Sequence, residues 1–92
     1  MDERVMYTLT DNAMYQKVLD ETVILDSQTG QYFTLDVITT QIVDLLNQQK
    51  TIADVATEIF ASYEAPIEVI NQDIVELVDE MLNKRLLKQV ND

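Results

Sequence analysis

The sequence "DSQTGQYFTLD", residues 26–36, admits three interpretations, and the choice between them sets the fold. Its acids, serine and glycine could mark a calcium loop. The pair Asp26-Ser27 could carry a phosphopantetheine arm. Alternatively, residues 26–30 could turn the chain between two strands. The residues on either side of this segment, and those within it, discriminate between the three.

The flanking sequence favours strands. Three short runs are rich in β-branched or aromatic residues: "YQKVLD" (15–20), "TVILD" (22–26) and "QYFTL" (31–35). Asp20-Glu21 is a plausible turn between the first two runs. Residues 27–30 separate the second and third, and Gly30 can supply a positive φ there. The segment "RVMYTLT" (4–10) is either a further strand or an ordered arm, and the residues leave this open.

From Asp36 onward the apolar spacing becomes that of helices. Asp36 is a candidate N-cap of the first helix, and Asp54 adds negative charge to the first turn of the second. Pro66 lies near the start of the third. The three apolar faces are Ile38, Ile42, Leu45 and Leu46; Ile52, Val55, Ala56, Ile59, Phe60 and Tyr63; and Ile67, Ile70, Ile74, Leu77, Val78 and Met81. Strands followed by helices predict an α+β domain, a three-stranded antiparallel sheet followed by three helices. The helices also have the outline of a winged helix-turn-helix.

The composition excludes several functions. Six Lys and Arg oppose 17 Asp and Glu, a net charge of −11, so nucleic acid and anionic membrane are disfavoured as partners. The absence of Cys and His removes thiolate ligands, the commonest general base and the commonest transition-metal ligand. No apolar segment reaches the length of a signal sequence or a membrane span, which predicts a cytoplasmic protein.

The calcium and carrier interpretations fail on local detail. Counted from Asp26 as the first position of an EF-hand, the glycine comes one place early and Val37 replaces the closing glutamate. Ser27 follows an acid, as in acyl carrier proteins, but a strand-like run follows it instead of a helix. The sequence therefore predicts neither a metal nor a cofactor, and the turn interpretation remains.

Catalysis is also disfavoured, because no nucleophile–base pair is present and the acids fall mainly on outer helix faces. A small sheet, by contrast, has edges that an extended peptide can complete. Strand alternation sends Phe33 and Leu35 to one face of the third strand, and Tyr32 and Thr34 to the other. One pair can then pack in the core while the other lines a groove, and the sequence does not say which.

The run "DETVILDSQTGQYFTLD" (20–36) resembles the hairpin of the PqqD-like proteins, in which a tG.Y..L pattern precedes three helices. The likeness extends over about residues 13–90, with residues 1–12 as an arm or extra strand. It continues through "IVDLL" (42–46), "TIADVA" (51–56), Tyr63, "QDIVELVDEML" (72–82) and Leu86-Leu87. The "DETV" opening and "TGQYFTLD" ending look most like the small discrete leader-binding proteins of lasso-peptide clusters.

The resemblance implies a recognition element for ribosomally synthesised and post-translationally modified peptides (RiPPs): a winged helix-turn-helix that binds a precursor's leader peptide without catalysis. In that family the leader adds as a strand to the third strand and lies against the third helix. The implied partners are the leader peptide, a separate leader peptidase and a macrocycle-forming enzyme. The implied binding residues are Gln31, Tyr32, Phe33, Thr34, Leu35, Ile70, Asp73, Ile74, Leu77 and Val78.

Three positions depart from the family pattern. Asp36 replaces a common Asn, Ile42-Val43 lacks a frequent Trp, and Arg85 stands where Gly often precedes the final Leu-Leu. The change at Arg85 bears on how the third helix ends. A structural or carrier subunit of a biosynthetic complex is the alternative function.

Overall fold

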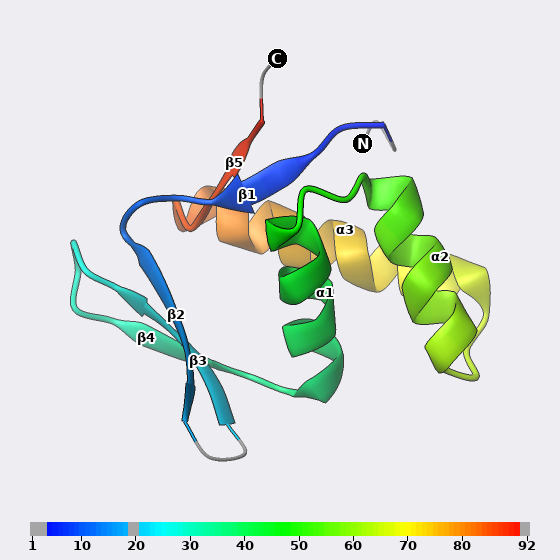
Figure 1. Cartoon of the computed structure of the whole chain (residues 1–92), viewed down its shortest axis with the longest axis horizontal. Helices are drawn as coiled ribbons and strands as arrows, with labels where there is room; N and C mark the ends of the chain where they lie inside the picture. The colour runs from blue at the N-terminus through cyan, green and yellow to red at the C-terminus, as the bar shows by residue number, and fades with distance from the viewer. Residues whose placement is uncertain (1–3, 19–20, 91–92) are drawn as a thin grey trace.

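Five strands and three helices make up the part of the chain that the computed structural model describes, residues 4–18 and 21–90 (Figure 1). The elements are β1 Tyr7–Leu9, β2 Ala13–Val18, β3 Glu21–Asp26, β4 Tyr32–Leu35, α1 Val37–Asn47, α2 Ile52–Ser62, α3 Ile67–Asn83 and β5 Leu87–Gln89. The predicted α+β class is confirmed, and the order of the elements fits a winged helix-turn-helix. No helix among the described residues is long and apolar enough to cross a membrane.

The three predicted strands form one antiparallel sheet in the order β2-β3-β4. The turn between β3 and β4 is built by Asp26, whose Oδ1 accepts hydrogen bonds from the Gln28 backbone N–H (3.0 Å) and from Asn12 Nδ2 (3.1 Å). Gly30 has φ 77°, a conformation that glycine adopts readily. The turn interpretation of residues 26–30 is thereby confirmed. Of the turn expected at Asp20-Glu21, residue 20 lies outside the described residues, and Glu21 begins β3.

A second, two-stranded sheet joins the two ends of the chain. β1 pairs antiparallel with β5, with Tyr7 opposite Gln89, so the segment 4–10 contains a strand that does not join the three-stranded sheet. The β5 strand was not anticipated from the sequence. Leu86, just before β5, and Leu87, its first residue, are buried at 2% and 3% exposure, which fastens the end of α3 to the core.

Two of the helices, α1 and α2, begin at side-chain caps. Asp36 Oδ1 accepts a hydrogen bond from the Thr39 N–H (2.8 Å), and Thr51 Oγ1 accepts one from the Asp54 N–H (3.1 Å). Asp36 is thus confirmed as the N-cap of α1. The buried face of α1 comprises Ile42, Val43 and Leu46. Predicted core positions at the element ends are more exposed: Ile38 at 40%, Phe60 at 49% and Ile67 at 36%.

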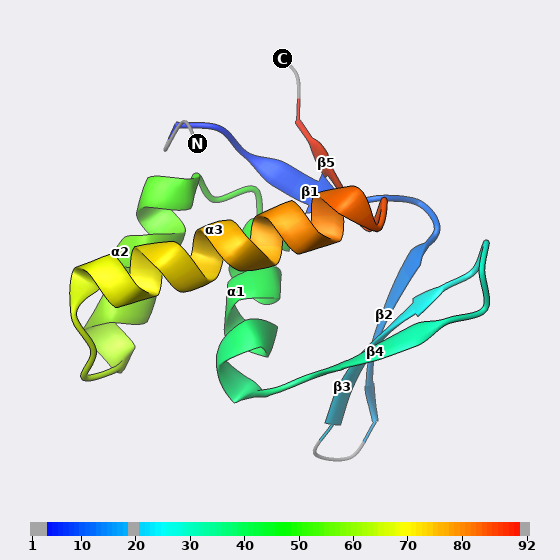
Figure 2. The same cartoon turned by 180° about the vertical axis from the view of Figure 1, so that it is seen from behind.

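The three-stranded sheet projects to one side of the helices, and β4 leads directly into α1 (Figures 1 and 2). Its inner face contributes Ile24 to the core, at 1% exposure. Its outer face carries an apolar row, because alternation and register bring Met14, Leu25 and Tyr32 side by side across the strands. Val18 and Val23 share this outer face.

Candidate peptide-binding site

β4 is an edge strand whose free side presents backbone hydrogen-bonding groups. The Asp26 N–H donates to the Gln31 carbonyl at 2.8 Å, so these two residues form a hydrogen-bonded pair of the β3–β4 ladder. In an antiparallel pair, hydrogen-bonded and non-bonded residue pairs alternate. With Ile24 opposite Phe33, Phe33 is therefore bonded to β3. The N–H and C=O groups of Tyr32 and Thr34 consequently point to the free side.

A groove runs beside this edge, between β4, the start of α1, and α3. One hollow of about 290 Å³ has Phe33, Leu35, Leu77 and Lys84 among its lining residues. A second hollow of about 310 Å³ continues along α3. Its lining is Asp36, Ile38, Thr39, Ile42, Asp73, Glu76, Leu77 and Glu80. The two share Thr39, Leu77 and Glu80, so they form one continuous groove along α3.

A third, smaller hollow extends the groove toward the start of α3. It measures about 50 Å³ and reaches Tyr63 and Ala65 at the end of α2. It shares Ile38, Ile42 and Asp73 with the second hollow. The line of hollows therefore follows α3 over most of its length and offers room for an extended chain.

The walls of the groove combine apolar surface with charge. Phe33 and Leu35 are half-buried and pack against the core. Lys84 Nζ lies 4.4 Å from the centroid of the Phe33 ring and 2.7 Å from Glu80 Oε1. Asp36 adds a carboxylate whose pKa is held below its usual range by the backbone N–H of Thr39, so it is charged at neutral pH.

The remaining groove acids lie on α3. Asp73, Glu76 and Glu80 are all exposed and line the second hollow. Glu76 Oε1 also accepts a hydrogen bond from Gln72 Nε2 at 2.9 Å. Lys84 is the one cation lining the hollows described above. The middle of the groove is therefore negatively charged, and the end near Phe33 carries a positive group.

The predicted strand residues lie beside the groove but differ in orientation. The side chains of Phe33 and Leu35 point inward, which answers the question that the sequence left open. The Tyr32 side chain is 70% exposed and belongs to the outer face, so Tyr32 can contribute to the edge through its backbone. Gln31 precedes β4, and its carbonyl already accepts from Asp26.

The predicted helix residues divide into two groups. Asp73 and Leu77 line the groove. Ile74 and Val78 have no exposed surface, so their side chains belong to the core. Ile70 is only 4% exposed but lines the third hollow at the start of α3. In this structure a peptide in the groove can reach Ile70 but not the side chains of Ile74 and Val78.

Two further α3 residues and the C-cap residue of the helix also line the groove. Glu76, Glu80 and Lys84 occupy the groove face, and Glu80 and Lys84 lie three and seven positions beyond Leu77. That spacing, once Leu77 is assigned to the groove, is the sequence signal that identifies Glu80 and Lys84. Thr39 and Ile38 were missed as well, since both belong to the first turn of α1.

Comparison with known proteins supports this architecture. The chain is similar to TbiB1, whose structure was solved in complex with the TbiA(beta) leader peptide. The two share 29% identity and a TM-score of 0.82, over 92% of this chain and 99% of TbiB1. A lasso peptide synthetase B1 complexed with its leader peptide has the same fold, at 24% identity and a TM-score of 0.84, over 89% of this chain and 96% of the other.

A comparison with curated proteins gives no match. The family model described as coenzyme PQQ synthesis protein D (PqqD) matches residues 21–87. This span runs from β3 to β5 and includes the edge strand and the whole of α3. The chain therefore belongs to the PqqD family.

Proposed function

We propose that this protein is a non-catalytic RiPP recognition element that binds the leader peptide of a ribosomal precursor. The observation that carries this proposal is the free β4 edge beside a groove walled by α3. The similarity to TbiB1, solved with a leader peptide, supports the same class of ligand here. A lasso-peptide precursor is the class that the resemblance of residues 20–36 to the leader-binding proteins of lasso-peptide clusters favours.

The leader binds by strand addition. Its backbone pairs with the N–H and C=O groups of Tyr32 and Thr34, and this part of the interaction is independent of side chains. Alternate leader side chains then enter the groove, where Phe33, Leu35 and Leu77 provide apolar contacts. The remaining leader side chains extend the outer face of the sheet. Affinity thus comes from the backbone, and selectivity comes from the groove.

The acids of the groove favour a leader that carries Lys or Arg. Charge reversal at Glu76 and Glu80 together should weaken binding of a basic leader at low salt, and the difference should shrink as salt rises. Glu58→Lys/Glu68→Lys makes the same change in net charge at exposed positions that line none of the groove hollows. An equal loss in both double variants would assign the effect to net charge instead of the groove.

Presentation to a separate leader peptidase follows from binding. A domain that holds both the leader and the peptidase raises the local concentration of the cleavage site at the enzyme. The uncovered apolar outer face, including Met14, Leu25 and Tyr32, supports a second protein contact, because such surface is otherwise disfavoured in water. The macrocycle-forming enzyme acts later on the released core peptide, in the cytoplasm where the precursor is made.

A titration of isotope-labelled protein with the leader of a precursor encoded beside its gene tests the proposal. Backbone amide signals of β4, and of Asp73 and Leu77 on α3, should shift together and saturate. Signals of α2 away from the groove, such as Glu58, serve as the internal reference. Unchanged spectra at high leader concentration, with an authentic precursor, would overturn the proposed function.

A further inference from the structure

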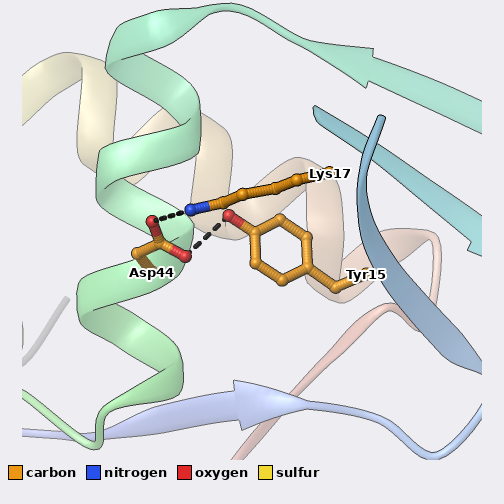
Figure 3. Close-up of polar contacts among 3 residues, drawn as sticks. All are labelled: Tyr15, Lys17 and Asp44. Carbon is orange, nitrogen blue, oxygen red and sulfur yellow. Dashed lines mark hydrogen bonds and ion pairs between the residues drawn. The ribbon is translucent and has the colours of Figure 1, made fainter. Parts of the chain in front are cut away.

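A polar cluster joins β2 to the middle of α1. The Tyr15 hydroxyl donates to Asp44 Oδ1 at 2.7 Å, and Lys17 Nζ lies 3.2 Å from Asp44 Oδ2 (Figure 3). Tyr15 and Lys17 are two positions apart on β2, so both point to the inner face of the sheet. We call Tyr15, Lys17 and Asp44 the β2–α1 clasp.

The clasp lies on the opposite edge of the sheet from the groove. The strand order β2-β3-β4 separates β2 from the free edge of β4 by a whole strand. None of the three clasp residues is among those lining the groove hollows. A peptide in the groove therefore has no contact with the clasp, and any influence of the clasp on binding must pass through the position of the sheet.

Besides the clasp, the sheet is attached to the rest of the fold by the packing of Ile24, Phe33 and Leu35 against the core and by the contact of Lys84 with the Phe33 ring. On the β4 side it is held by the chain itself, where Asp36 begins α1. At the corner near the β3–β4 turn, Asn12 Nδ2 donates to Asp26 and, at 3.3 Å, to the Arg85 carbonyl. α3 packs chiefly on α2 and β5, and its end reaches β4 through the contact of Lys84 with Phe33. The distance between β4 and α3 therefore depends largely on how the sheet sits on α1.

We propose that Tyr15 and Asp44 are positioning residues that fix the sheet on α1 and thereby set the width of the leader-binding groove, an inference that rests on the proposed function. A sheet released at its β2 edge can turn about the joint at Asp36. Only a fraction of the molecules then has a correctly spaced groove. The apparent affinity for the leader equals the intrinsic affinity multiplied by that fraction. With the clasp closed, the groove is ready before the peptide arrives.

Within the clasp, the Tyr15–Asp44 bond is the principal connection. It joins a neutral donor to a carboxylate, and such bonds are short and strong. Burial and the neighbouring carboxylate raise the pKa of Tyr15 well above its usual range, so the hydroxyl keeps the proton that it donates. Lys17 contributes less, because its side chain is 58% exposed and solvent screens the ion pair.

The test compares clasp variants in leader binding. Tyr15→Phe and Asp44→Ala should each weaken leader affinity roughly three- to tenfold, as expected if the competent population falls to about a tenth to a third. The double variant should be no weaker than Asp44→Ala alone, because Asp44→Ala already breaks the bond that Tyr15→Phe removes. Asp44→Asn retains an acceptor for Tyr15 and should restore most of the affinity.

Two controls separate positioning from loss of stability. Val55→Ala removes core volume in α2, away from the sheet, and should lower the melting temperature without changing the affinity of the folded protein. Residual dipolar couplings of the free protein should show the sheet reoriented relative to α1 in Tyr15→Phe and unchanged in Val55→Ala. Unchanged affinity in Tyr15→Phe, or unchanged couplings, would overturn the positioning role.

The dipolar couplings also keep this inference distinct from the proposed function. If the wild-type protein binds no leader, the proposed function fails and the groove has no demonstrated ligand. The couplings still decide whether the clasp sets the sheet angle, because they are measured without peptide. If the wild type binds and Tyr15→Phe binds equally well, only the clasp inference fails.

Discussion

Lys84 reaches from α3 to β4, where its Nζ lies 4.4 Å from the centroid of the Phe33 ring. The same ammonium group is 2.7 Å from Glu80 Oε1 on its own helix. This contact connects the two walls of the groove at the end nearest the sheet. Because Lys84 is 40% exposed in its side chain, the connection is modest in energy and open to solvent.

Replacing Lys84 with Met keeps the aliphatic stem and removes the charge. The free energy of unfolding should fall by about 0.5–1 kcal/mol, the usual contribution of an exposed cation–π contact. Urea denaturation measures the change. Lys88→Met on β5, also an exposed position, removes a charge without touching Phe33. Equal stability of the two variants would show that the Phe33 contact contributes nothing.

Substitutions at two neighbouring residues of α3 should distinguish a loss of leader affinity from a loss of stability. Leu77 is half-buried and lines the groove, whereas Val78 has no exposed surface. Leu77→Ala should weaken leader binding about tenfold, the equivalent of about 1.4 kcal/mol. Val78→Ala should leave the affinity of the folded protein unchanged and lower stability by about 2 kcal/mol through the cavity it creates.

Calorimetric titration with the leader and thermal denaturation supply the two readouts for this pair. A leader that binds Leu77→Ala as tightly as the wild type would remove Leu77 from the site. Weaker binding by a fully folded Val78→Ala protein would show that the leader reaches the residues assigned to the core.

The β3–β4 turn should make stability depend on pH in acid. The backbone N–H of Gln28, followed by the Asn12 side chain, holds the pKa of Asp26 below its ordinary value of 3.8. A carboxyl whose pKa is lower in the folded state stabilises the fold above the unfolded-state pKa. That stabilisation disappears as the pH falls through the folded-state pKa. The window therefore lies below about pH 4.

Denaturation curves between neutral pH and pH 2 test this expectation. Asp26→Asn keeps the size of the side chain but cannot titrate, so its stability should fall less steeply below pH 4 than that of the wild type. Asp79→Asn, at an exposed position on α3, controls for the loss of one negative charge. Parallel acid profiles for the wild type and Asp26→Asn would contradict the role given to Asp26.

The end of α3 offers a stabilising substitution. Arg85 has φ 59°, and the Leu86 N–H donates to the Met81 carbonyl at 2.8 Å, a pairing typical of left-handed helix termini. Arg85→Gly should raise the free energy of unfolding by about 0.5–1 kcal/mol, because glycine adopts this conformation without a Cβ clash. Arg85→Ala keeps the Cβ and should show no comparable gain. An unchanged melting temperature for Arg85→Gly would contradict this reading of the terminus.

Local signals made the hairpin and the helix starts predictable. Asp26 accepts hydrogen bonds within the β3–β4 turn, Gly30 adopts the positive φ of that turn, and Asp36 caps α1. Each of them acts within a few residues of its own position. Their effects can therefore be predicted from a short stretch of sequence. The glycine expected at position 85 from the family pattern is explained in the same way, by the positive φ that Arg85 adopts.

Long-range features were not predictable from local pattern. The β1–β5 pair is only three residues long and joins the two ends of the chain. The apolar stripe of α3 is wide, and periodicity alone does not divide it between core and groove. Ile74 turned inward and Leu77 toward the groove because α2 and β5 pack on particular sides of α3, which is a property of the assembled fold.

Amide hydrogen exchange along β4, measured with and without the leader peptide, tests the central claim most directly. In the free protein, Phe33 and Leu35 should already be protected by β3, whereas Tyr32 and Thr34 should exchange rapidly. A saturating leader should slow exchange at Tyr32 and Thr34 by at least about tenfold, as expected for newly formed ladder hydrogen bonds. Unchanged exchange at these two amides, with the leader demonstrably bound, would show that the peptide does not add to this strand.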